Sequence, residues 1–173
     1  LGMGGFVSGP GAVAAKLKGI PLVIHEQNSV AGTTNKLSAK IATRVMQGFP
    51  NTFVQGEHCG NPVRKEIAAI KPPVERFADR QGAMRLLVLG GSRGALAINQ
   101  LIPEALAKIN PQQRPEILHQ VGGQHLEKTQ ALYQAQNLDI DSDAIQIVPF
   151  IDCMEQAYQW ADFAICRSGA LTV

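Results

Sequence analysis

The chain has 173 residues, of which 45% are hydrophobic and 17% charged, a balance that predicts a folded protein with a core. A formal net charge of only +2 argues against a nucleic-acid partner, which would need a broad basic surface. No run of about 18 apolar residues occurs, so no membrane-spanning helix is predicted. Cys59, Cys153 and Cys166 are far apart and outside any Cys-x-x-Cys spacing, which indicates reduced, mostly buried thiols of a cytoplasmic protein and neither a disulfide framework nor a metal site.

Apolar runs typical of strands alternate with helical stretches along the whole chain. The expected strands are residues 21–25, 44–47, 85–89, 116–120, 144–148 and 163–166. The expected helices lie between them, at about residues 10–18, 33–43, 94–109, 123–136 and 152–160. Such alternation predicts βαβ units, and therefore an α/β fold with parallel sheets that are covered on both faces.

One stretch interrupts this alternation and divides the chain. Residues 70–82, IKPPVERFADRQG, contain adjacent prolines and charges without a sustained period, which is typical of an interdomain connection. A new Rossmann-like unit follows, beginning with a strand and a glycine loop. We therefore expect two Rossmann-like domains, both incomplete: residues 1–63 of the first, a linker region at 64–83, and residues 84–173 of the second.

Three glycine-containing loops each separate a predicted strand from a helix: GMGGFVSGPG at 2–11, GGSRG at 90–94 and RSGA at 167–170. Glycine lets the backbone approach a ligand closely, and the free N–H groups of a helix N-terminus favour an anion. A tight turn alone would also require glycine, but two such loops with hydroxyl groups in one sheet favour a phosphate ligand. A nicotinamide dinucleotide is not indicated, because Leu89 replaces the first glycine of that fingerprint and the next strand ends in HQVG, without an acid.

Polar residues follow two other predicted elements. Adjacent strand residues point to opposite faces, so at most one of His25 and Glu26 faces a given pocket, where it would be suited to proton transfer. Asn28, in the next loop, either hydrogen-bonds a sugar hydroxyl or amide or caps its own loop. Arg64, after a proline-containing turn, either reaches a phosphate as a rigid fork or lies on the surface.

A basic row borders an apolar one on the second predicted helix. Lys36, Lys40 and Arg44 recur every four residues, as do the apolar residues Leu37, Ile41 and Val45, which are expected to form the buried stripe. The basic row is either a solvated face or a contact for anionic lipid head groups.

Several stretches, in this order and spacing, closely resemble one family: GMGGFVSGPG, IPLVIHEQN, AGTTNKLSAKIA, GNPVR, LLVLGGSRGA, VPFID and ADFAICRSGALTV. They resemble the bacterial UDP-N-acetylglucosamine–N-acetylmuramyl-(pentapeptide) pyrophosphoryl-undecaprenol N-acetylglucosamine transferases, which form lipid II for peptidoglycan. The resemblance runs through the whole chain and implies the glycosyltransferase B fold, with the active site between two Rossmann-like domains. Because the family's chain is considerably longer, we expect this sequence to be an internal piece without transfer activity of its own.

The resemblance also implies a set of site residues: Asn28, Arg64, Ser92, Ile151, Ala170, Leu171, Thr172 and Val173, with Gly90, Gly91 and Gly94 in the phosphate loop. Ile151 is expected to contact uracil through its backbone groups. Ser92 and Arg64 are expected to face the diphosphate. Asn28 and the four residues from Ala170 to Val173 are expected to line the sugar and the nucleotide.

The implied reaction is an inverting displacement in which the C4 hydroxyl of the muramyl sugar attacks the anomeric carbon of UDP-N-acetylglucosamine. The implied partners are this donor, the undecaprenyl-linked acceptor lipid I, and the cytoplasmic face of the cell membrane, to which the protein binds peripherally. No cofactor, metal or nucleic acid is expected, and no catalytic residue is assigned, although Glu26 is an outside candidate for the base. The alternatives are a UDP-sugar epimerase of the same architecture and a non-catalytic nucleotide-sugar-binding subunit.

Overall fold

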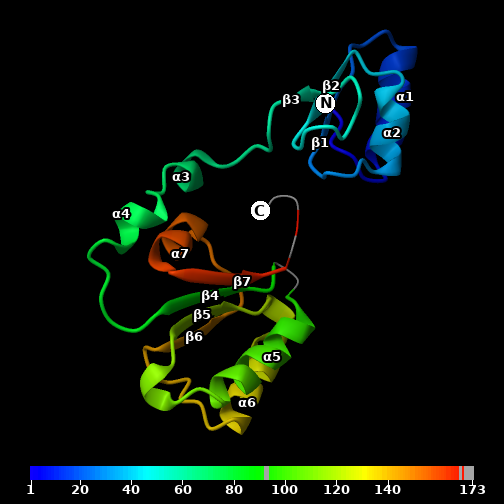
Figure 1. The fold of residues 1–173 in the computed structure, drawn as a ribbon. Helices are drawn as coiled ribbons and strands as arrows, with labels where there is room; N and C mark the ends of the chain where they lie inside the picture. Colours follow the sequence, from blue (N-terminus) through cyan, green and yellow to red (C-terminus); the bar gives the residue numbers. More distant parts are fainter. Residues whose placement is uncertain (92–93, 168, 170–173) are drawn as a thin grey trace. The chain divides into compact units, whose positions relative to one another are not determined.

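The computed structural model describes residues 1–91, 94–167 and 169 (Figure 1). The described residues group into two compact units, Leu1–Val63 and Arg64–Arg167. Every strand pair described in them is parallel, so the α/β class predicted from the alternation is confirmed. Ser92 and residues 170–173, which the sequence analysis assigned to the site, lie outside the described residues.

The first unit is a parallel sheet with two helices side by side on one face (Figure 1). Its strands are β1 (Val23–Glu26), β2 (Arg44–Gln47) and β3 (Glu57–His58), and its helices are α1 (Ser8–Leu17) and α2 (Thr33–Ala39). Gly2 pairs with Ile24 beside β1. The buried side chains between the sheet and the helices are Ala12, Leu22 and Ile24.

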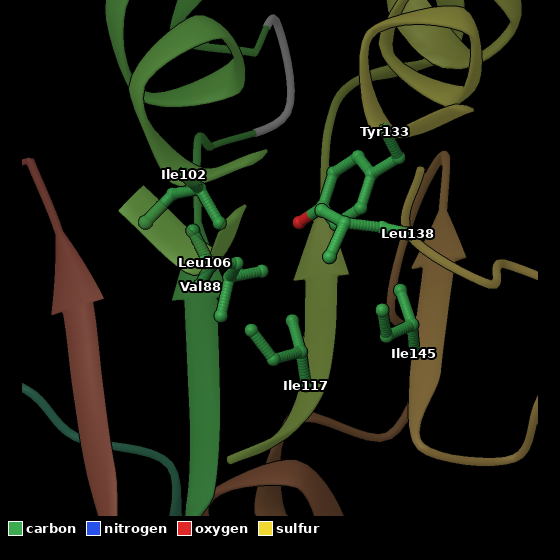
Figure 2. Packing of buried hydrophobic residues seen from close by; sticks show 7 residues of the cluster. All are labelled: Val88, Ile102, Leu106, Ile117, Tyr133, Leu138 and Ile145. Atoms are coloured by element: carbon green, nitrogen blue, oxygen red, sulfur yellow. The ribbon is translucent and has the colours of Figure 1, made fainter. Parts of the chain in front are cut away.

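The second unit is a parallel sheet with helices on both faces (Figure 1). In spatial order its strands are β6 (Ile145–Val148), β5 (Glu116–Gln120), β4 (Arg85–Leu89) and β7 (Phe163–Cys166). Helices α5 (Leu96–Ala107) and α6 (Leu126–Ala135) cover one face, and α7 (Met154–Trp160) covers the other. The larger core lies under α5 and α6 and consists of Val88, Ile102, Leu106, Ile117, Tyr133, Leu138 and Ile145 (Figure 2).

The predicted linker region contains structure that the sequence analysis did not predict. Two short helices form in it, α3 (Lys65–Ala68) and α4 (Pro73–Phe77). Pro73 occupies the start of α4, where the missing proline N–H costs no helical hydrogen bond. Two further short elements also escaped prediction, because neither is long enough to show a period: strand β3 and the 3-10 turn η1 (Pro111–Gln113).

Two arginines fix this region to the second unit. The Arg76 guanidinium donates hydrogen bonds of 3.0 Å to three carbonyl oxygens at the C-terminal end of α7, those of Tyr158, Gln159 and Ala161. Carbonyls in this position have no partner within their own helix, and the helix dipole favours a cation there. Arg80 forms a largely buried ion pair with Asp162 at 3.2 Å. Residues that read as an open connection are therefore held by backbone carbonyls and a carboxylate about 80 positions away.

His119 is a completely buried titratable group in the second unit. It lies on β5, and its Nδ1 is 2.9 Å from the hydroxyl of Tyr133 on α6. Burial lowers the pKa of His119 from 6.5 to about 4, because the charged ring would lose its hydration. The folded protein therefore holds this histidine neutral at a pH where the unfolded chain already binds a proton.

We predict that the second unit loses stability in acid through His119. Between pH 6.5 and about 4 the unfolded state binds more protons, so stability is complete above pH 6.5 and falls as the pH is lowered. The expected loss is about 3 kcal/mol, levelling off below the folded pKa. Urea unfolding followed by fluorescence of Trp160, the single tryptophan, measures it.

The variant His119→Leu should show a flatter pH dependence, whereas His58→Gln, on the exposed strand β3, should keep the original slope. An unchanged slope in His119→Leu would contradict the assignment.

Candidate functional site

The order of the strands points to one edge of the second sheet. Strands β4, β5 and β6 follow one another to one side, whereas β7 pairs with the other side of β4. The connection through α7 therefore crosses the opposite face from α5 and α6. In sheets of this kind, ligands bind outside the carboxyl ends of the strands where the order reverses. This switch point lies beyond Leu89 and Cys166, the last residues of β4 and β7.

The loop that follows β4 has the geometry that only glycine allows. Gly90 is buried, and a Cβ atom on it would lie 2.8 Å from the backbone nitrogen of Ala95. Gly91 and Gly94 have φ angles of +81° and +74°. A Cβ on Gly94 would also overlap the carbonyl oxygen of Val121, whereas one on Gly91 would meet no atom within 4 Å. The loop leads into α5, so its backbone approaches the switch point closely at the positive end of a helix dipole.

Ile151 follows β6 and is anchored by its side chain. That side chain packs against the α7-face core, which includes Leu87 and Leu89, and it lines a pocket of about 300 Å³ together with Trp160. In the described part of the chain, no group hydrogen-bonds to the backbone N–H or C=O of Ile151. Its two backbone groups are therefore available for a ligand while the side chain holds the loop in place.

Arg64 begins the second unit, immediately before α3, and its side chain is exposed. Burial, and after it the charge of Cys166, raises the pKa of Tyr158 on α7, while the positive charge of Arg64 opposes this rise. The guanidinium therefore lies near Tyr158 on α7. Among the described residues none forms a hydrogen bond or an ion pair with it. Among the described residues, Arg64 is thus an exposed cation beside α7 without a counterion.

In the first unit, a buried carboxylate organises the loop that contains Asn28. Only 2% of Glu26 is exposed, and its carboxylate accepts four hydrogen bonds. Oε1 accepts from the backbone N–H of Asn28 at 3.1 Å and from its Nδ2 at 2.8 Å. Oε2 accepts from the backbone N–H of Gly32 at 3.0 Å and from Nδ2 of Asn35 at 2.9 Å. The loop between β1 and α2 is wrapped around this single charge.

These contacts argue against Glu26 as the general base, for which it was an outside candidate. Burial raises the pKa of its carboxyl group, but the hydrogen bonds from Asn35, Asn28 and Gly32 outweigh burial, and the pKa lies below the ordinary value of 4.5. A carboxylate that is buried, satisfied and less basic than usual is poorly suited to take a substrate proton. Its role is to hold the loop.

His25 and Gln27, at the end of β1, hold a second turn at Gly60 and Asn61. Nε2 of His25 donates to the carbonyl oxygen of Gly60 at 3.0 Å, and Nδ1 accepts from Nε2 of Gln27 at 3.1 Å. Nδ2 of Asn61 donates to the backbone oxygen of Gln27 at 3.0 Å. As expected from strand geometry, His25 and Glu26 serve opposite faces. His25 is buried and engaged through both ring nitrogens, so it ties the turn at Gly60 to the end of β1.

One partner in this arrangement, Asn35, was not singled out from the sequence. Asn35 lies inside α2, is 1% exposed, and reaches both Glu26 and the carbonyl oxygen of His25. It also lies beneath the first glycine loop, since a Cβ on Gly4, whose φ is +82°, would be 3.2 Å from its Nδ2. A buried asparagine in a helix is the signal that would have indicated this role, because such a residue must find polar partners.

Leu37 differs from the expectation. It was predicted to belong to the buried stripe of the second helix, but it is 61% exposed, because the residues that α2 buries are Asn35 and Ser38. The cysteines also differ from the expectation of mostly buried thiols, since Cys59 and Cys153 are exposed and Cys166 is half-buried.

No group of three or more metal-ligating side chains gathers within residues 1–91, 94–167 and 169. In the same part of the chain, no helix is both long and apolar enough to cross a bilayer.

Known proteins share these features. The glycosyltransferase family 28 C-terminal domain matches residues 85–173, and the N-terminal domain of the same family matches residues 1–47. The crystal structure of Acinetobacter baumannii MurG superimposes with a TM-score of 0.77 and 42% identity, covering 99% of this chain and 47% of that one. Curated relatives from Dechloromonas aromatica and Histophilus somni are 49% and 54% identical over all 173 residues, which cover 48% of each relative. Both are named UDP-N-acetylglucosamine--N-acetylmuramyl-(pentapeptide) pyrophosphoryl-undecaprenol N-acetylglucosamine transferase.

Two parallel α/β units with glycine loops at the carboxyl ends of their strands define the glycosyltransferase B type of fold, as the resemblance implied. The chain belongs to glycosyltransferase family 28. It spans about half the length of the curated relatives it matches.

We predict that two glycines of the β4–α5 loop differ sharply when replaced by alanine. Gly91→Ala should cost only the strain of a positive φ, about 1–2 kcal/mol. Gly94→Ala adds overlap with the Val121 carbonyl and with the ring of His125, and should cost about 1–3 kcal/mol more. Urea unfolding followed by Trp160 fluorescence compares them; equal losses would show that the space around Gly94 is not confined.

Proposed function

We propose that the full-length protein transfers N-acetylglucosamine from UDP-N-acetylglucosamine to the C4 hydroxyl of the muramyl sugar in undecaprenyl-linked lipid I, which yields lipid II for peptidoglycan. The observation that carries the proposal is identity of 49–54% across the whole chain to curated transferases with this activity in their names. Matches to both domains of glycosyltransferase family 28 support it. Neither an epimerase nor a non-catalytic binding subunit has comparable support.

In this proposal the nucleotide lies at the switch point of the second sheet. The diphosphate rests on the backbone of Gly90, Gly91 and Gly94, where the N-terminus of α5 favours negative charge. Arg64, immediately before α3, supplies a full positive charge, and the backbone of Ile151 meets the uracil ring. Ser92 and the residues from Ala170 to Val173 complete the contacts to diphosphate, sugar and nucleotide, and Asn28 contacts the sugar from the first unit.

The reaction is a single displacement with inversion. The C4 oxygen of the muramyl sugar forms a bond to the anomeric carbon of the donor as the bond to the diphosphate oxygen breaks, and UDP departs with the bonding electrons. The hydroxyl proton passes to a base, which we do not assign to any residue of this chain. A helix dipole and a guanidinium aimed at the departing diphosphate stabilise the charge that develops there, and this is the principal catalytic contribution of the second unit.

The first unit is the proposed acceptor domain, and its helix α2 is the proposed contact with the cytoplasmic face of the cell membrane. Lys36 and Lys40 are exposed around Leu37, itself 61% exposed, so cationic and apolar side chains lie together on one short helix. Basic side chains attract anionic head groups, and an apolar side chain among them adds burial at the interface. The protein would bind the membrane peripherally, close to a lipid-linked acceptor.

The direct test uses the full-length protein, radiolabelled UDP-N-acetylglucosamine and a soluble lipid I analogue. We expect label to appear in the lipid product only when the acceptor is present, with release of UDP. Conversion of the donor to another UDP-sugar without acceptor would identify an epimerase. Tight donor binding without either reaction would identify a binding subunit, and both outcomes would contradict the proposal.

Arg64 is proposed to bind the diphosphate through its guanidinium. Arg64→Lys keeps the charge but loses the planar fork that binds two phosphate oxygens, so we expect kcat/KM to fall about tenfold. Because the side chain is exposed, the unfolding midpoint should not change. Lys65→Ala, the next exposed residue along α3, is the matched control and should retain activity. Full activity in Arg64→Lys would contradict the phosphate contact and show that this arginine is only a solvated surface residue.

A further inference from the structure

The side-chain amide of Asn28 has two chemically different ends, and the structure distinguishes them. Nδ2 donates to Oε1 of Glu26 at 2.8 Å. An ionised carboxylate is only an acceptor, so the NH₂ end must face it and the oxygen end must face away. Asn28 is exposed, and in the described part of the chain its Oδ1 has no hydrogen-bond partner. The residue therefore presents a fixed acceptor to its surroundings.

The orientation of the Asn28 amide is strongly fixed, because the carboxylate of Glu26 is itself held in place. Both of its oxygens are engaged, with Oε2 bound by the backbone N–H of Gly32 and by Nδ2 of Asn35. The backbone N–H of Asn28 also donates to Oε1, so main chain and side chain of Asn28 hold the same atom. Rotating the Asn28 amide by half a turn would place its oxygen against a buried carboxylate, which is a costly arrangement.

We propose that Glu26 is a positioning residue that holds Asn28 with its Oδ1 outward, so that Asn28 accepts a hydrogen bond from a hydroxyl group of the bound sugar. This inference rests on the proposed function, which supplies the sugar. Glu26 itself touches no ligand in it. Its carboxylate acts through Asn28 by deciding which end of the amide the ligand meets, and it thereby selects a ligand with a hydroxyl donor at that place.

A polar site that is built for one hydrogen-bonding partner discriminates strongly against a ligand without it. The experiment therefore compares UDP-N-acetylglucosamine with UDP-sugar analogues in which single hydroxyl groups are replaced by hydrogen, in the full-length protein. We expect wild type to lose about tenfold or more in kcat/KM on one analogue. Asn28→Ala should transfer the natural sugar more slowly and should no longer discriminate against that analogue.

Variants of Glu26 test the positioning role separately. In Glu26→Gln the new side chain has an amide nitrogen that can donate to Oδ1 of Asn28. The Asn28 amide can therefore turn its oxygen toward residue 26 and away from the sugar, so discrimination against the deoxy analogue should also fall. The double variant Glu26→Gln and Asn28→Asp exchanges the carboxylate and the amide. The amide nitrogen at residue 26 then donates to one carboxylate oxygen at residue 28, and the other oxygen at residue 28 faces outward. We expect it to recover part of the discrimination that Glu26→Gln loses, with full recovery prevented because the backbone N–H of residue 28 then faces a donor.

Asn35→Ala is the matched control, because it removes one donor from the same carboxylate but leaves Oε1 and Asn28 together. It should lower the unfolding midpoint while discrimination stays within about twofold of wild type. If Glu26 merely stabilises the loop, Asn35→Ala and Glu26→Gln will lose discrimination alike and the double variant will recover nothing, which would overturn the inference. Absence of transfer by wild type would instead overturn the proposed function.

Discussion

Parallel pairing of the strands is the constraint on which both units depend. Each described strand must be reached by a crossover, so its carboxyl end opens into a loop on the same edge as its neighbours. In the second unit, the proposed ligand site therefore lies beyond Leu89 and Cys166, where the strand order reverses. The glycines after Leu89 follow from the same constraint, because that loop must turn into α5 against the end of the neighbouring strand β5.

A buried charge imposes a second constraint on the first unit. Glu26 is almost fully removed from water, and an ionised carboxylate is tolerated there only when its oxygens are satisfied. The donors come from the loop at Asn28 and Gly32 and from the helix at Asn35, so one side chain determines how loop and helix meet. The adjacent His25 does the same for the turn at Gly60 on the other face. A motif that suggested acid–base chemistry is instead the framework that orients Asn28.

Sequence reasoning succeeded where local pattern decides structure. The strands at 44–47, 85–89, 116–120 and 163–166 were predicted with the boundaries that the structure has, because each is an apolar run between turn residues. It failed where contacts between distant residues decide. Helices α3 and α4 have only four and five residues and show no period, and Arg76 of α4 instead binds the end of α7, 82 residues away. Helix α2 buries Asn35 and Ser38 and leaves Leu37 exposed, and the burial of Glu26 depends on Asn35, nine residues along the chain.

The central claim is that a UDP-sugar binds at the switch point of the second sheet. A crystal structure of the full-length protein with UDP-N-acetylglucosamine measures this directly. The account predicts that the diphosphate lies within hydrogen-bond distance of the backbone of residues 90–94 at the start of α5, with uracil against the backbone of Ile151. A nucleotide bound elsewhere, with the loop after Leu89 empty, would contradict it.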